Sequence, residues 1–173
     1  EAYYKAQRYE EAATAYADFL KQHPNDSRID DIIYQLGLSY YQQMLSADRD
    51  QTSTRNALNV FEELLRRFPE YPMAEETGYL IQRCRNRLAE HEVYVGHYYL
   101  KKEYFQAAIT RLEKSLTDYP NYYYRDKAYY YLGLAYLQTG QNDKAKEVLN
   151  QLFEQFPGSE YLIQAQKALA EDY

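Results

Sequence analysis

The side chains best suited to metal binding or nucleophilic catalysis are few in this chain of 173 residues. They are three histidines and one cysteine: His23, His91, His97 and Cys84. His91 and His97 are six residues apart, so they cannot present their rings on one helical face as an i, i+4 zinc pair does. Cys84 lies among apolar residues at helical spacing, as a small core residue would. We therefore expect no metal site, no cofactor and no reactive thiol.

Acidic residues that could serve acid–base catalysis stand next to each other in the sequence. Glu62-Glu63 and Glu75-Glu76 diverge on a helix, whereas a catalytic pair must converge on the substrate. The sequence also has no glycine-rich phosphate loop, no Gly-x-Ser-x-Gly elbow and no strand-like alternation. These observations predict a binding protein that is not an enzyme.

The balance of charge excludes one large class of partners. The chain carries 20 Lys and Arg against 26 Asp and Glu, a net charge of −6. A phosphate track needs concentrated Lys and Arg, so we expect no nucleic-acid binding. No apolar run approaches the roughly 18 residues that span a bilayer.

Arginine and tyrosine are the residues best suited to protein recognition. Arg83 and Arg87 share one helical face, and the alternative interpretation is a solvated face balanced by nearby Glu. Arg111 stands apart, with Thr110 and Ser115 as weakly polar surroundings. That setting leaves its guanidinium available for a carboxylate on a partner.

Small residues and prolines recur at fixed distances and show how these side chains are positioned. A glycine, an alanine and a proline follow one another at spacings of twelve and twelve in two segments, and a third segment has eight extra residues between the first two: Gly96, Ala108, Pro120; Gly133, Ala145, Pro157; Gly37, Ala57, Pro69. Small residues mark the close approach of two helices, and proline ends the second helix. The chain is therefore predicted to be a series of helical hairpins.

This pattern resembles the tetratricopeptide repeat, which has Leu-Gly and Tyr in its first helix and Ala, an aromatic residue and Pro in its second. The resemblance implies an all-α fold, a right-handed superhelical solenoid of stacked hairpins. We expect a single domain over 1–173, made of a partial repeat 1–26, a repeat 27–70 with a polar loop insertion 46–53, a repeat 71–121, a repeat 122–158 and a capping helix 159–173. The first helix of repeat 71–121 is expected to be long, about 30 residues.

The repeat frame also predicts which residues line a concave groove. They stand three before, one after and four after each glycine: Tyr34, Leu38, Tyr41; Val93, His97, Leu100; Tyr130, Leu134, Leu137. Such an apolar, aromatic-edged trough suits an extended segment or a helix with hydrophobic anchors, unless neighbouring helices cover it. Tyr34, Val93 and Tyr130 replace the Lys, Arg and Asn of carboxylate-clamp co-chaperones, which argues against that use.

The candidate partner-binding residues are taken from the groove and from the basic positions: Arg111, Arg83, Arg87, Tyr34, Tyr41, Tyr130, Leu134 and Leu137.

Several longer motifs carry a more specific resemblance. They are the run from Glu1-Ala-Tyr-Tyr-Lys-Ala to Phe19-Leu20, the insertion with Asp48-Arg49-Asp50, the run from Arg87-Leu88-Ala89 through Gly96-His97-Tyr98-Tyr99, and Ala107 to Leu112. In this order they resemble the BamD family of outer-membrane assembly lipoproteins from its second repeat onward. Generic tetratricopeptide proteins lack the insertion and the long helix.

The resemblance implies a non-catalytic scaffold of the β-barrel assembly machinery, at the periplasmic face of the bacterial outer membrane. Its carboxy-terminal repeats would contact a POTRA domain of BamA, with Arg111 at the matching basic position. Its amino-terminal repeats would bind unfolded outer-membrane protein segments, and BamC or other lipoproteins would be further partners. The membrane is reached only through a lipid anchor, which we expect upstream of Glu1 together with the missing first repeat.

Two other interpretations stay open at this point. One is another periplasmic tetratricopeptide adaptor of the cell-division coordinator type, which shares the phrase from Tyr9 through Phe19-Leu20, although the insertion argues against it. The other is a regulatory repeat arm of a larger enzyme.

Overall fold

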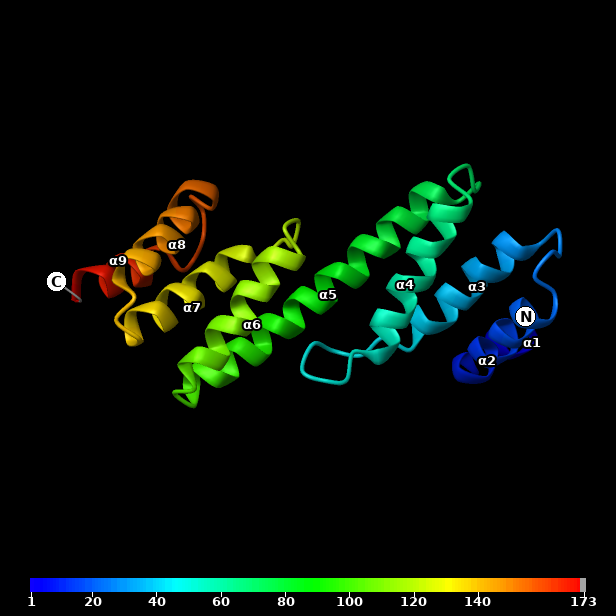
Figure 1. Cartoon of the computed structure of the whole chain (residues 1–173), viewed down its shortest axis with the longest axis horizontal. Helices are drawn as coiled ribbons and strands as arrows, with labels where there is room; N and C mark the ends of the chain where they lie inside the picture. Colours follow the sequence, from blue (N-terminus) through cyan, green and yellow to red (C-terminus); the bar gives the residue numbers. More distant parts are fainter. Residues whose placement is uncertain (172–173) are drawn as a thin grey trace. The chain divides into compact units, whose positions relative to one another are not determined.

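The computed structural model describes residues 1–171, and all regular secondary structure in them is helical (Figure 1). The helices are α1 (Ala2–Lys5), α2 (Tyr9–Gln22), α3 (Ile29–Gln42), α4 (Thr52–Arg67), α5 (Ala74–Lys101), α6 (Phe105–Asp118), α7 (Arg125–Gln138), α8 (Asn142–Gln155) and α9 (Leu162–Glu171). Consecutive helices pair as hairpins, which confirms the predicted all-α fold. The superhelical path, the single-domain organisation and the repeat boundaries stay predictions.

Prolines set the ends of the second helix of each hairpin. Helices α2, α4, α6 and α8 each stop two residues before a proline: Pro24, Pro69, Pro120 and Pro157. Proline has no backbone N–H to donate, and it disfavours the helical conformation of the residue before it. Each helix therefore ends before that preceding residue.

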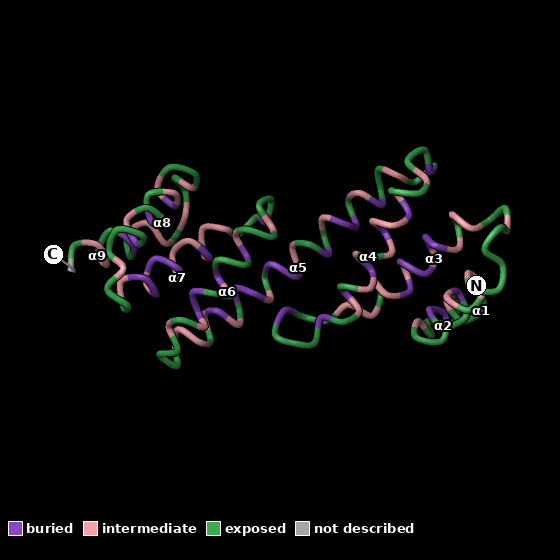
Figure 2. The backbone as a smooth tube through the Cα atoms, in the orientation of Figure 1, coloured by how far each residue is buried: buried purple, intermediate pink, exposed green. Residues whose placement is uncertain are grey.

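Helix α5 is the long element that the sequence predicted, with 28 residues. The chain divides into two compact units, Glu1–Leu88 and Ala89–Tyr173, and the boundary lies within this helix. We call them unit 1 and unit 2 and describe each by itself. Within each unit, Figure 2 shows buried positions on the facing sides of paired helices.

The core of unit 1 forms where α4 packs against α3. Phe61 is fully buried and lies against Gly37, so closely that a Cβ added to this glycine would stand 2.4 Å from the Phe61 ring. Cys84 is also fully buried in the same cluster, where the sequence placed it. The close helix approach predicted from Gly37 is therefore confirmed.

Unit 2 repeats this contact twice. Leu112 of α6 lies against Gly96 of α5, and Leu149 of α8 lies against Gly133 of α7. An added Cβ would stand 2.6 Å from Leu112 and 2.4 Å from Leu149. Both leucines are fully buried, so each hairpin has one large side chain filling the space that a glycine leaves.

Three hairpins turn in the same way. At Gln7, Glu103 and Gly140 the backbone has positive φ, at 58°, 63° and 68°. In the α5–α6 hairpin, Tyr104 donates its backbone N–H to the Tyr99 carbonyl, and Glu103 donates its N–H to the Leu100 carbonyl. This pair of bonds is a Schellman motif, which usually places glycine at the left-handed residue. Only Gly140 follows that preference.

The insertion forms the connection between α3 and α4. It contains hydrogen bonds to a buried side chain, which a polar loop that only bulges into solvent would lack. We predicted an outward loop over 46–53, but α4 already begins at Thr52, because Asp50 accepts the Thr52 N–H at 2.9 Å. Gln51 is 1% exposed; its amide donates to the carbonyls of Ser46 and Arg49, and Thr54 donates to its carbonyl oxygen. The loop is thus closed around one buried amide.

The chain's last helix, α9, occupies most of the predicted capping segment 159–173, of which residues 172–173 lie outside the described part. Ala165 of α9 is buried against Leu149 and Leu152. Among the described residues, no helix combines the length and the apolar character needed to cross a membrane.

The glycine contact yields a test with a matched control. Gly37→Ala should lower the free energy of unfolding by about 1–2 kcal/mol, because the rigid, fully buried Phe61 ring has no room to move and overpacking outweighs the gain in helix propensity. Gly78→Ala, in α5 with no atom within 4 Å of the new Cβ, should instead raise it by up to about 1 kcal/mol. Thermal melts followed by circular dichroism compare the two, and equal effects would contradict the close approach.

Candidate functional site

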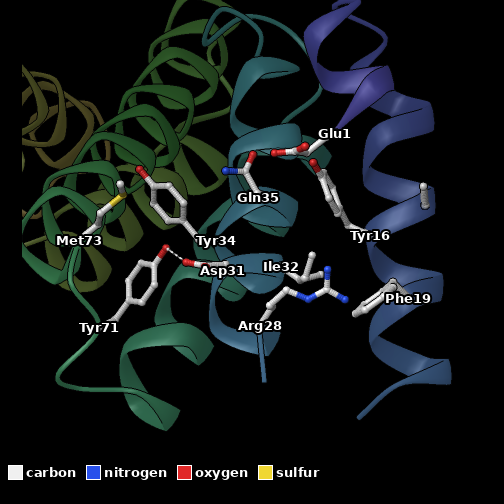
Figure 3. Close-up of a pocket in the computed structure, with 11 residues that line it drawn as sticks. Glu1, Tyr16, Phe19, Arg28, Asp31, Ile32, Tyr34, Gln35, Tyr71 and Met73 are labelled. Carbon is white, nitrogen blue, oxygen red and sulfur yellow. Dashed lines mark hydrogen bonds between the residues drawn. The ribbon is translucent and has the colours of Figure 1, made fainter. Parts of the chain in front are cut away.

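Unit 1 contains a pocket of about 580 Å³ between α2, α3 and the turn that precedes α5 (Figure 3). Its lining mixes aromatic, aliphatic and polar side chains: Tyr16, Phe19, Tyr34 and Tyr71; Ala15, Ile32 and Met73; Glu1, Arg28, Asp31 and Gln35. The cavity is of the size that accommodates a small ligand or a few side chains of a peptide.

Two tyrosines on one wall of the pocket are held as hydrogen-bond donors. The Tyr71 hydroxyl donates to Asp31 Oδ1 at 3.0 Å, and the Tyr34 and Tyr71 ring centroids are 5.6 Å apart. Burial, followed by the charge of Glu76, raises the pKa of Tyr34 to about 12, and burial with the Asp31 contact raises the pKa of Tyr71 further. Both phenols therefore stay protonated at neutral pH.

On the opposite wall, Tyr16 has an unsatisfied hydroxyl. Its side chain is 6% exposed, and the hydroxyl oxygen has no hydrogen-bond partner among the described residues. Burial and then the Glu1 carboxylate raise the pKa of Tyr16, and Figure 3 shows the hydroxyl turned toward Glu1. A buried unpaired hydroxyl costs free energy, so this group lowers the stability of the fold.

The one guanidinium at the pocket is already engaged. Arg28 binds both carboxylate oxygens of Asp26, at 3.0 and 3.1 Å, and lies 5.6 Å from the Phe19 ring centroid. The hydrogen bonds from Arg28 lower the pKa of Asp26 to about 2. The Arg28 guanidinium is therefore not free to bind a second carboxylate through the same two nitrogens.

Of the predicted groove residues in unit 1, Tyr34 and Tyr41 lie at different depths. Tyr34 is 4% exposed and belongs to the core, with one side facing the pocket. Tyr41 is half-buried near the carboxyl end of α3, and the charges of Arg83 and Arg87 act on its hydroxyl. Arg85, between them in sequence, instead donates to Glu62 of α4 at 2.7 Å.

In unit 2, Arg111 lies in an ionic cluster that the sequence did not reveal. Its Nη1 donates to Glu92 Oε2 at 3.0 Å, and Lys114 Nζ donates to Glu92 Oε1 at 3.0 Å. The Glu92 side chain is 7% exposed, whereas those of Arg111 and Lys114 are 40% and 44% exposed. Burial would raise the pKa of Glu92, but the hydrogen bonds and charges of Lys114 and Arg111 outweigh it and lower the pKa.

The predicted surroundings of Arg111 are therefore wrong in one respect. Thr110 and Ser115 do not frame the guanidinium, because their hydroxyls donate to the backbone carbonyls of Gln106 and Ala89. The neighbour is Glu92, which holds one edge of Arg111 and leaves the remainder partly exposed. Glu92 is 19 residues away from Arg111 in the sequence. The sequence alone does not predict this ion pair, because it forms only when α5 packs against α6.

The aromatic groove positions of unit 2 form a stacked cluster. The His97 ring lies 4.1 Å from Tyr131 at an interplanar angle of 7°, and Tyr130 stacks on Tyr161 at 5.0 Å. Leu137 packs at the edge of the core, and Leu134 is half-buried. The repeat pattern did not predict that Tyr131 and Tyr161 belong to this cluster. Their spacing in the sequence does not distinguish them from tyrosines of the core.

No group of three or more His, Cys, Asp or Glu in residues 1–171 is arranged to hold a metal ion. Burial raises the pKa of Cys84 to about 12, which keeps the thiol protonated at neutral pH. The arrangement can bind partners through aromatic surface, hydroxyls and guanidinium groups.

Comparison with known proteins identifies similar chains. Residues 1–152 match the YfiO family model, described as an outer membrane lipoprotein. Three similar proteins are each named outer membrane protein assembly factor BamD. That of Rickettsia prowazekii is 31% identical over 156 residues, 90% of this chain and 62% of that protein. Those of Neisseria meningitidis serogroup A and Caulobacter vibrioides are 30% and 27% identical, over 95% and 97% of this chain and 65% and 55% of their own lengths. The chain thus spans less than two thirds of the length of these relatives.

The unpaired hydroxyl of Tyr16 can be tested against the paired one of Tyr71. Tyr16→Phe should leave the free energy of unfolding unchanged or raise it by up to about 1 kcal/mol, because it removes an unsatisfied buried group. Tyr71→Phe should lower it by about 1 kcal/mol, because the bond to Asp31 is lost. Urea titrations of both variants provide the comparison, and a clear loss for Tyr16→Phe would show that its hydroxyl has a partner.

A second test uses the histidine of the aromatic cluster. Burial, followed by the charges of Lys101 and Lys127, lowers the pKa of His97. The unfolded chain therefore binds this proton at higher pH than the folded chain, so stability is full above the unfolded value of about 6.5 and falls as the pH drops below it. His97→Phe, which keeps a ring on Tyr131, should lose less stability than the parent chain between about pH 7.5 and pH 5.5. Equal losses in urea midpoint would exclude His97 as the titrating group.

Proposed function

The chain belongs to the YfiO family of outer membrane lipoproteins, and from this membership we propose that it is a non-catalytic scaffold in the assembly of outer-membrane β-barrel proteins. The family match over residues 1–152 is the observation that carries the proposal. The printed names of the relatives, outer membrane protein assembly factor BamD, describe the same role. In such a role the protein works by holding other proteins in place.

The first proposed partner is the POTRA region of BamA, bound through unit 2. Arg111 stands at the basic position that the family resemblance assigns to this contact. Its guanidinium is held on one edge by the buried Glu92 carboxylate, while 40% of the side chain stays exposed. A guanidinium fixed in this way loses little conformational freedom when it binds a partner carboxylate.

Unfolded outer-membrane protein segments are the second proposed class of partner, bound through unit 1. The pocket next to Tyr16, Tyr34 and Tyr71 has the aromatic lining and the volume to take apolar side chains of an extended chain. Contacts with BamC or another lipoprotein form part of the same proposal.

We place this activity at the periplasmic face of the outer membrane, with attachment through a lipid anchor, on the basis of the family. The match to an outer membrane lipoprotein family favours this role over the cell-division coordinator and over the regulatory arm of an enzyme.

A pull-down with isolated BamA POTRA domains tests the first contact. The parent chain should be retained, and Arg111→Gln should weaken the affinity about 10-fold to 100-fold, as expected for a charge contact in an interface. We prefer this variant to Arg111→Glu, because Glu92 keeps Lys114 as a cation and no second carboxylate is placed against it.

Arg85→Gln is the matched control, since it removes one exposed arginine whose partner is Glu62 in unit 1. Its retention should equal that of the parent chain. Unchanged affinity of Arg111→Gln would remove Arg111 from the interface, and failure of the parent chain to bind would contradict the scaffold proposal.

A further inference from the structure

The turn between α4 and α5 lies among three hollows in the surface of unit 1. The first is the pocket of Figure 3, the second, of about 510 Å³, begins at Tyr79, and the third, of about 310 Å³, begins at Phe68. Tyr71 lines the first and the third, Pro72 the second and the third, and Met73 the first and the second. The hollows therefore adjoin one another along this turn, and we call the three together the turn surface.

Apolar side chains stand open on the turn surface. Met73 is 45% exposed and Tyr79 is 58% exposed, and both line the second hollow. Tyr71, which separates the first hollow from the third, is instead buried, and its hydrogen bond to Asp31 fixes the turn. Exposed apolar side chains beside a fixed turn can anchor a partner with little reorganisation.

Carboxylates surround the same turn. Those that α3, the turn itself and α5 contribute to the three hollows are Asp30, Asp31, Glu70, Glu75 and Glu76. None of these five forms an ion pair with a Lys, Arg or His of residues 1–171. Asp31 accepts a hydrogen bond from the neutral Tyr71 phenol, which does not cancel its charge.

The arginines of the turn surface do not balance these charges. Arg28 is bound to both carboxylate oxygens of Asp26, and Arg67 lies 3.8 Å from Glu63. Even counted in full, the two arginines leave the five carboxylates in excess. Arg83 lies one turn beyond Tyr79 on α5 and donates to the Tyr79 hydroxyl. In a chain of net charge −6, the turn surface therefore complements a cation.

Four of these acids also have a role within their own helices. Asp30 and Asp31 stand in the first turn of α3, and Glu75 and Glu76 stand in the first turn of α5, where a negative charge stabilises the helix end. That role does not require the open apolar side chain of Met73 beside them. The combination of carboxylates with exposed apolar surface is what indicates a binding site.

We propose that the turn surface binds an extended, basic segment of a partner protein, in which Lys or Arg alternates with apolar residues. Its apolar side chains would enter the hollows beside Met73 and Tyr79, and its cations would meet Glu70, Glu75 and Glu76. The proposal deepens the binding of unfolded segments proposed for unit 1 and rests on it, since it names the charge of the segment that binds.

The test uses the full chain and peptides with acetylated and amidated ends, followed by isothermal titration calorimetry at low ionic strength. The basic peptide Gly-Ser-Leu-Lys-Phe-Lys-Leu-Ser-Gly should bind, with affinity that falls as salt is raised. The same peptide with Gln in place of both Lys should bind at least about 5-fold more weakly, and the one with Glu more weakly still. Equal affinities of the three peptides, or no binding of the basic one, would overturn the proposal without requiring any variant to fold.

Two double variants of equal charge then locate the site. Glu75→Gln/Glu76→Gln should weaken binding of the basic peptide about 5-fold to 10-fold, as expected for two exposed charges. Glu147→Gln/Glu154→Gln changes the net charge by the same amount at exposed positions of α8 in unit 2, and it should bind as the parent chain does. Circular dichroism checks that both variants fold. Equal losses in the two would show attraction to the overall charge of the chain and overturn the proposal.

Met73→Ser tests the apolar part of the turn surface. The Met73 carbonyl accepts the Thr77 N–H at 2.9 Å, so residue 73 is the N-cap of α5, a position that serine favours. The variant should therefore keep the helix while it removes the apolar side chain, and it should weaken the basic peptide several-fold. Unchanged affinity would contradict the apolar contact and overturn the proposal.

The proposals can fail separately. If the neutral peptide binds as tightly as the basic one and Met73→Ser weakens both, the binding of unfolded segments by unit 1 stands and the preference for a basic segment falls. Binding of the basic peptide at the turn surface without POTRA retention would support the turn surface and contradict the partner proposed for unit 2.

Discussion

The contact between a repeat glycine and one large side chain of the following helix is the constraint on which the structure depends. Gly37 faces Phe61, Gly96 faces Leu112 and Gly133 faces Leu149, and in every case an added Cβ would stand within 2.6 Å of that side chain. The contact fixes how closely the two helices approach and which faces they bury. Of the candidate binding residues, Arg83, Arg111 and Tyr41 lie on surface that stays exposed or half-exposed once these faces are buried.

The polar groups of the candidate sites are positioned by hydrogen bonds between helices. Glu92 is buried by the packing of α5 against α6 and fixes Arg111 and Lys114, while Asp31 fixes the hydroxyl of Tyr71. In both contacts a buried group, Glu92 or Tyr71, is paired with side chains that still reach the surface. The donors of Arg111, Lys114 and Tyr71 are thus held in fixed orientations by the folded chain.

The sequence predicted those features that depend on spacing. Gly, Ala and Pro at fixed distances located the hairpins, and the uninterrupted apolar phase from Leu80 to Tyr98 predicted α5. It could not predict contacts between side chains far apart in sequence, such as Arg111 with Glu92 or His97 with Tyr131, since these follow from the rotation of each helix about its axis. The insertion was predicted to be an outward polar loop, because the sequence does not show that the Gln51 side chain is buried.

The insertion between α3 and α4 leaves the packing register untouched. Gly37 and its partner Phe61 are 24 residues apart, whereas Gly96 and Leu112, like Gly133 and Leu149, are 16 apart, so the eight extra residues are absorbed entirely by the loop. Because Gln51 bonds the loop carbonyls of Ser46 and Arg49, the segment supplies its own internal partners. The exposed side chain of Arg49 is thus an attachment point for a fluorophore or an affinity tag that leaves the Asp50 cap of α4 in place.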